Sequence, residues 1–113
     1  MERNITKADM VDSIARATGI TKVDTKAVLE GMITTIINAV SRGDKVEIRG
    51  FGIFNSKKRK ARLARNPKNG KLISLNERYI PLFKPSNDFT KKVNAVRFPN
   101  QNANNTTKNN NDF

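Results

Sequence analysis

The first segment with a regular hydrophobic pattern lies near the amino terminus and has the spacing of an amphipathic helix. Thr6 is suited to cap this helix because Asp9 stands three residues later, as in a capping box. Apolar side chains follow at helical intervals at Val11 and Ile14, and Gly19 supplies a common helix stop. We therefore predict a short helix between Thr6 and Gly19.

A second and longer helix is predicted from its capping residue, Thr21, to about Arg42, where Gly43 follows. Its apolar positions form two adjacent columns at four-residue spacing, and the opposite face is polar. The apolar positions are Val28, Leu29, Met32, Ile33, Ile36, Ile37 and Val40, and the polar ones are Lys26, Glu30, Thr34 and Asn38. Packing within the chain uses part of such a stripe. Its width indicates burial against more than one neighbour, and a partner chain is one candidate.

From residue 45 onward the pattern changes to the two-residue period of β-strands. Residues 45–49 alternate, and Gly50-Phe51-Gly52 marks a bend or bulge. Farther along, Pro67 presets a turn. We predict one long hairpin over residues 53–83 with its tip near Pro67, and within it a protruding arm at about 56–76.

A third, short helix is predicted after the hairpin. Pro85 suits its first turn, apolar residues recur at helical spacing from Phe89, and Pro99 ends it. Residues 98–113 are rich in Asn and poor in apolar side chains, so we expect a disordered tail there. The folded domain is accordingly predicted to span residues 1–97.

Charge is distributed unevenly along the chain, whose formal net charge is +12. Residues 1–47 are neutral overall, whereas residues 48–76 contain nine basic residues and no acidic one. Solvated protein faces normally mix both signs, and a long cationic stretch repels itself unless a polyanion binds it. The charge leaves three kinds of partner open: nucleic acid, an anionic membrane surface and an acidic protein.

Composition argues against several other functions. The sequence contains no histidine and no cysteine. The chain therefore has no imidazole base, thiol nucleophile or disulfide, and it lacks the usual ligands of zinc and haem. Its carboxylates form no recognisable catalytic or metal-binding motif. No apolar run approaches the ~18 residues of a membrane span, and the first residues lack a signal peptide's apolar stretch. We predict no enzymatic activity, no cofactor, no metal and no membrane span.

The predicted arm is too polar to fold back onto a core. Each limb of about ten residues would reach roughly 33 Å. An isolated two-stranded ribbon is marginal in water, so a partner should order it, and ribbons of this kind fit DNA grooves. Pro67 at the tip is rigid and apolar, which suits either an ordinary turn or a wedge between base pairs.

Two motifs flank the basic arm: Gly50-Phe51-Gly52-Ile53-Phe54 and Arg65-Asn66-Pro67-Lys68-Asn69-Gly70, followed by Phe83-Lys84-Pro85. With the order of the helices, they resemble the HU and integration host factor family of bacterial histone-like DNA-binding proteins over about residues 5–96. The resemblance implies an α+β fold: an intertwined dimer with a helical base, a β-saddle and two protruding β-ribbon arms. It also implies an architectural protein that binds the minor groove with its arms, and that bends and compacts double-stranded DNA.

The resemblance and the basic run together assign the site residues. DNA contacts are expected from Lys7, Lys57, Arg59, Lys60, Arg62, Arg65, Asn66, Pro67, Lys68, Lys71 and Lys84. Pro67 is expected to intercalate, and Phe51, Phe54 and Phe83 to form the dimer core. The implied partner is double-stranded DNA, preferably already bent or distorted, with no membrane and no small-molecule substrate as partner. The implied location is the cytoplasm, at the nucleoid.

Two alternatives to a homodimeric, HU-like protein of low sequence specificity stay open. One is a subunit like those of integration host factor, which pairs with a different chain and prefers defined sites. The other, less favoured, is a basic RNA-binding or ribosome-associated protein, for which stacking aromatics are scarce because Tyr79 is the single Tyr. Two residues depart from the family pattern: Ser86 replaces a common Gly, and Leu72 a usually polar or acidic residue.

Overall fold

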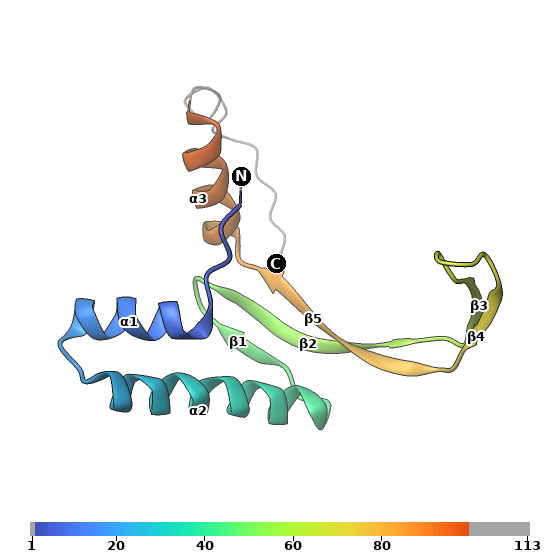
Figure 1. The fold of residues 1–113 in the computed structure, drawn as a ribbon, viewed down its shortest axis with the longest axis horizontal. Coiled ribbons are helices and arrows are strands. Elements are labelled where there is room, and N and C mark those ends of the chain that lie inside the picture. Colours follow the sequence, from blue (N-terminus) through green and yellow to red (C-terminus); the bar gives the residue numbers. More distant parts are fainter. Residues whose placement is uncertain (1, 100–113) are drawn as a thin grey trace. The chain divides into compact units, whose positions relative to one another are not determined.

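The computed structural model describes residues 2–99, which form an α+β fold with three helices and five strands (Figure 1). The helices are α1 (Lys7–Thr18), α2 (Lys22–Ser41) and α3 (Asn87–Arg97). The strands are β1 (Val46–Ile48), β2 (Gly52–Arg59), β3 (Arg62–Arg65), β4 (Leu72–Leu75) and β5 (Arg78–Pro85). The chain divides after Asn38 into two compact units, and most of the predicted tail lies outside the described residues.

The ends of α1 confirm the helix predicted from the capping pattern. The Thr6 backbone N–H donates to the Asp9 carboxylate at 2.9 Å, and the Asp9 N–H donates to the Thr6 hydroxyl at 3.2 Å. The hydrogen bond from the Thr6 backbone to the Asp9 carboxylate, followed by a hydrogen bond from the Thr6 side chain, lowers the pKa of Asp9 below its ordinary value of 3.8. Gly19 ends the helix in the left-handed conformation, at φ 79°.

Helices α1 and α2 lie side by side, and α1 with most of α2 belongs to the first unit (Figure 1). The Lys7 ammonium binds the Glu30 carboxylate at 2.9 Å, and Lys22 binds Asp12 at 3.1 Å. The interior between the helices is small. Its buried side chains are Val11, Ala15, Thr25 and Leu29.

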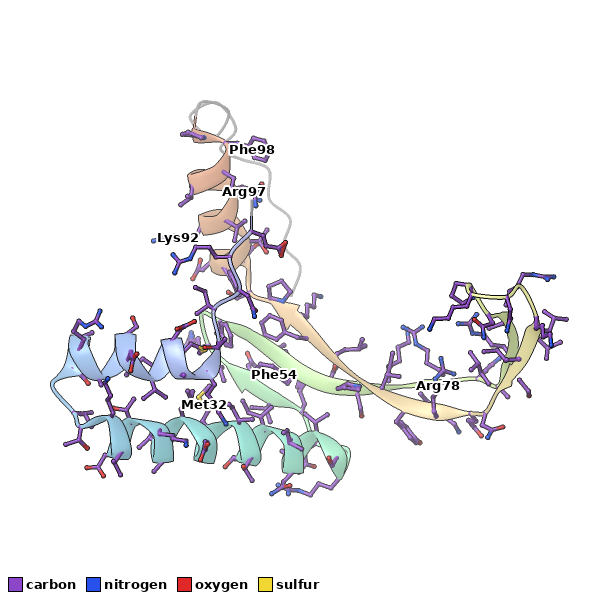
Figure 2. The ribbon with its side chains drawn as sticks, viewed as in Figure 1. Met32, Phe54, Arg78, Lys92, Arg97 and Phe98 are labelled. Atoms are coloured by element: carbon purple, nitrogen blue, oxygen red, sulfur yellow. The ribbon has the colours of Figure 1, made fainter. Side chains whose placement is uncertain are left out.

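The apolar stripe of α2 is largely open in the single chain. Val28 is 71% exposed, Ile37 57% and Met32, labelled in Figure 2, 45%. Among the described residues no large side chain is fully buried. The stripe therefore provides apolar surface that a single chain leaves in contact with water.

The second unit contains a three-stranded antiparallel sheet in the order β1-β2-β5. Its tight β1–β2 turn explains why two glycines occur close together. Gly50 has a φ of 83°, which favours glycine. Gly52 lies so close to β5 that a Cβ there would overlap the ring of Phe83 and lie 2.6 Å from the Lys84 carbonyl oxygen.

The predicted hairpin is present, but it consists of two paired segments. Strands β2 and β5 pair from Gly52 opposite Pro85 to Arg59 opposite Arg78. Two residues on each limb then leave the ladder, and β3–β4 pairing resumes with Arg62 opposite Leu75, in unchanged register. The ribbon turns at this interruption (Figure 1). The predicted hairpin with its tip near Pro67 is confirmed. The interruption was not predicted, because the sequence of a limb carries no signal for where a narrow, twisted ribbon loses its pairing.

The start of α3 differs from the prediction that Pro85 opens the helix. Pro85 is the last residue of β5, an edge strand where the missing N–H is tolerated. Ser86 caps the helix instead: its hydroxyl accepts from the Phe89 N–H at 3.1 Å, and its own N–H donates to the Phe51 carbonyl at 2.8 Å. This buried serine therefore ties the start of α3 to the β1–β2 turn.

None of the helices in residues 2–99 has the length and apolar character needed to cross a membrane.

Candidate nucleic-acid interface

The β2–β5 ribbon presents two chemically different faces. Side chains directly opposite each other share a face, and the face alternates along each strand. Phe54 and Phe83 are opposite each other and define the aromatic face. The other face, here called the basic face, contains Lys57, Arg59, Arg78 and Lys84. The aromatic pair therefore lies on one face of the sheet, and the four cations, interspersed with Ile53, Ile80 and Leu82, lie on the other.

On the aromatic face, four phenylalanines from the β1–β2 turn, β2, β5 and α3 pack together. The ring centroids of Phe54 and Phe83 are 4.6 Å apart, those of Phe51 and Phe83 5.1 Å, and those of Phe51 and Phe89 5.6 Å. Phe51, Phe83 and Phe89 are each 37–39% exposed. Phe89 was missing from the predicted aromatic set, although its place on the apolar face of the third helix was a usable signal. The cluster is well packed on one side and open on another.

Charge pairing distinguishes the lysines of the ribbon. Lys58 lies on the opposite face from Lys57 and Arg59, and its ammonium binds the Glu77 carboxylate at 2.7 Å. The basic face contains no carboxylate along β2 or β5. Glu77 therefore neutralises a cation outside the basic face.

Arg78 belongs to the basic face but was not among the predicted site residues. It lies directly opposite Arg59, in the last pair of the β2–β5 ribbon before the interruption (Figure 2). Composition gave little sign of it, because Arg78 lies outside the stretch that lacks acidic residues and follows Glu77 immediately. Counting residues along both limbs from the turn at Pro67, with the register held constant, would have placed Arg78 opposite Arg59.

At the ribbon tip, Arg65 and Asn66 shape the loop itself. The Arg65 guanidinium donates to the Gly70 carbonyl at 2.6 Å, and the Asn66 side-chain oxygen accepts from the Lys68 N–H at 2.9 Å. The Asn66 N–H donates to the Lys71 carbonyl at 2.8 Å, closing the loop. Pro67 is exposed at the turn that these bonds hold.

The distal pair β3–β4 mixes cations with exposed apolar side chains. Arg62 and Ala64 share one face with Leu75 and Ile73, and the other face carries Leu63, Arg65, Leu72 and Ser74. Leu63 is 65% exposed and Leu72 57%. The distal arm is therefore less polar than its charge density suggests.

The other predicted contacts occupy three places. Lys60 lies in the interruption between β2 and β3, Lys68 and Lys71 lie at the tip, and all three are exposed. Within residues 2–99 none of these three forms an ion pair. Lys7, in contrast, lies in the helical unit and is paired with Glu30, whose pKa is lowered by the hydrogen bond from Lys7 and then by its charge.

Comparison with known proteins gives consistent matches. The family model described as "Bacterial DNA-binding protein" matches residues 5–94. DNA-binding protein HU of Thermus thermophilus is 38% identical over 92 residues, covering 81% of this chain and 95% of that protein. HU of Thermotoga maritima is 39% identical over 89 residues, covering 79% and 99%. A cocrystal structure of Anabaena HU with DNA matches with a TM-score of 0.72 and 42% identity, covering 78% of this chain and 96% of that one.

Proposed function

The chain belongs to the family of bacterial DNA-binding proteins, and we propose that it binds the minor groove of double-stranded DNA with its ribbon and bends the duplex. It is an architectural DNA-binding protein of the HU type. The observation that carries the proposal for the ribbon is its basic face, which gathers four cations opposite an aromatic face and contains no carboxylate along β2 or β5. The HU structure with DNA matched above supports the same partner.

Binding would draw its affinity chiefly from phosphate neutralisation. Cations that contact phosphates release condensed counterions, so affinity falls steeply with salt. If a dimer engages about ten phosphates, the slope of log K against log salt is about −9. The arm residues assigned from the sequence, with Lys84 at the base of the ribbon, would follow the backbone along the groove. Lys7 would join them from the helical unit.

Bending would come from the exposed Pro67. A proline inserted between base pairs unstacks one step, at a cost of a few kcal/mol that contacts along the curved duplex offset. The loop that contains Pro67 is closed by its own hydrogen bonds. These bonds would hold the proline ring in a fixed position at the tip. DNA that is already bent, nicked or gapped would bind more tightly because part of the deformation is present beforehand.

We propose a homodimer as the working form. The open α2 stripe, with Val28 and Ile37 mostly exposed, and the partly exposed aromatic cluster together give each chain two apolar surfaces to cover. Phe51, Phe54 and Phe83 would then contribute to the shared core. A dimer also supplies two ribbons, which lets one molecule hold the duplex at both ends of a bend.

The proposal assigns the protein no catalytic step and no cofactor, in keeping with a sequence without His or Cys. Its place would be the nucleoid, where its DNA partner is. The folded, DNA-binding domain would span residues 1–97, and we assign no role to the segment that follows.

The decisive experiment compares three ligands at several salt concentrations: a linear DNA duplex, the same duplex with a central gap, and a duplex RNA of equal sequence. We expect tightest binding to gapped DNA, weaker binding to linear DNA, weakest binding to RNA, and a steep loss with salt. Light scattering on the free protein and on the complex should give two chains per molecule. Equal affinity for RNA and DNA, or a monomer bound to DNA, would overturn the corresponding part of the proposal.

A further inference from the structure

We propose that Arg59 and Arg78 act together as a clamp for a single phosphate of the DNA backbone. This clamp rests on the proposed function and adds Arg78 to the expected DNA contacts. Arg78 lies outside the basic stretch 48–76 and was not assigned a contact from the sequence. It also changes the role of Arg59 from an independent contact to one half of a pair.

The register of the ribbon pairs the two arginines. Arg59 and Arg78 are directly opposite each other in the last pair of the β2–β5 ladder. Opposite residues on an antiparallel pair have Cβ atoms about 4.5–5.5 Å apart and share a face. Two guanidinium groups are therefore anchored side by side on the basic face, where like charges directly opposite each other are unfavourable.

No carboxylate in the described part of the chain compensates the positive charges of the two arginines. Within residues 2–99 neither arginine takes part in an ion pair. The neighbouring Glu77 binds Lys58, on the other face, at 2.7 Å. Arg78 makes a long hydrogen bond of 3.4 Å to the Asn76 carbonyl, which leaves most of its donors free. A bound anion would attract both guanidinium groups and so offset the repulsion between them.

The shape of the guanidinium groups suits a phosphate ligand. Each guanidinium is a planar fork that can donate two parallel hydrogen bonds to a phosphate. Two forks on adjacent strands can hold one phosphate from both sides, and Lys57, diagonal to Arg78 on the same face, adds a third positive charge nearby. A phosphodiester fits this arrangement because its two free oxygens accept from separate donors.

The Arg59–Arg78 pair lies where the β2–β5 ladder ends. Directly beyond it, both limbs leave the ladder, and the ribbon turns before β3–β4 pairing begins (Figure 1). A phosphate held by one residue from each limb would join the two strands at the point where their backbone hydrogen bonds stop. The clamp would thereby hold the base of the distal arm on the DNA backbone.

The test uses the full chain, a linear DNA duplex and four variants: Arg59→Gln, Arg78→Gln, the double variant, and Arg78→Lys. Arg97→Gln, at the exposed end of α3, is the matched control for loss of one guanidinium. Binding is measured by fluorescence anisotropy over a range of salt. If both arginines hold one phosphate, each single substitution lowers affinity about tenfold, and the salt slope falls by about one for each arm. The double variant then loses little more than either single one.

The control should change affinity by less than about twofold. Arg78→Lys should keep most of the salt slope but lose affinity, because it retains the charge without the fork. Additive losses in the double variant would overturn the clamp, as would Arg78→Gln behaving like Arg97→Gln. Either result with normal DNA binding by the unsubstituted protein leaves the proposed function intact. Failure of the unsubstituted protein to bind DNA contradicts that function.

A second measurement without DNA separates binding from structure. Hydrogen exchange of the β2 and β5 amides should slow in Arg78→Gln because the repulsion with Arg59 is gone. Added inorganic phosphate should slow exchange in the unsubstituted protein more than in the variant. If Arg78→Gln instead exchanges faster, Arg78 holds the ribbon together structurally and the clamp is wrong.

Discussion

Gly52 lies directly against the ring of Phe83, so close that any β-carbon at this position would overlap the ring. The contact places the start of β2 against β5 at the aromatic cluster, and the Lys84 carbonyl closes the other side at 2.6 Å from the hypothetical Cβ. The glycine is therefore required by close packing, and its own φ is not in the positive range.

We expect Gly52→Ala to destabilise the protein by about 1–3 kcal/mol, the usual cost of overpacking a well-filled site. The ring of Phe83 or the backbone of β5 must move to admit the methyl group. Gly31→Ala on α2 is the matched control, since a Cβ there meets nothing within 4 Å. It should stabilise the chain by about 0.5–1 kcal/mol through helix propensity. Urea unfolding of both variants tests this, and equal stability of Gly52→Ala and the unsubstituted protein would contradict the packing argument.

The helical unit should lose stability in acid. The pKa values of Asp9 and Glu30 are both lowered in the folded chain, from ordinary values of 3.8 and 4.5. Their contribution is present above those values and is lost as pH falls through the lower, folded ones. Urea midpoints should therefore fall as pH drops below about 4.5. Glu30→Gln and Lys7→Gln should each flatten this decline, because each removes the same interaction. A decline unchanged in both variants would show that the Lys7–Glu30 pair contributes nothing.

The open apolar stripe of α2 can be tested as the dimer interface. Ile37→Lys places a charge in a surface that is 57% exposed in the single chain and buried in the proposed dimer. We expect light scattering to show loss of the dimer, and the unfolding midpoint to fall. Thr34→Lys adds the same charge to the exposed polar face of the helix and should leave both unchanged. A stable dimer of Ile37→Lys would place the interface elsewhere.

The helices could be predicted from sequence because their signals are local. The Thr6–Asp9 capping box and the stop at Gly19 depend on residues three to five positions apart, and the structure shows both. Pro85 misled the prediction for a related reason: proline suits the first turn of a helix and the end of an edge strand equally well. The capping side chain at Ser86 decided between them.

The basic surface was only partly predictable, because a count of charges does not assign them to faces. Lys57 and Lys58 are neighbours in sequence, yet they project to opposite faces and one of them is neutralised by Glu77. Arg78 and Arg59 are far apart in sequence and opposite each other in the ribbon. Register links these residues, and it depends on the turn geometry at the tip.

Substitution of Pro67 should separate DNA bending from DNA binding. The ring is exposed at the turn, and no charge is lost in Pro67→Ala, so the variant should keep most of its affinity and an unchanged salt slope. Its bend angle should shrink, because alanine is too small and flexible to hold a base step open. Single-molecule energy transfer between the ends of a bound duplex measures the angle directly, and Lys68→Ala provides the converse control. That variant should lower the salt slope while the bend persists in the complexes that form. An undiminished bend in Pro67→Ala would assign the curvature to the phosphate contacts of the ribbons.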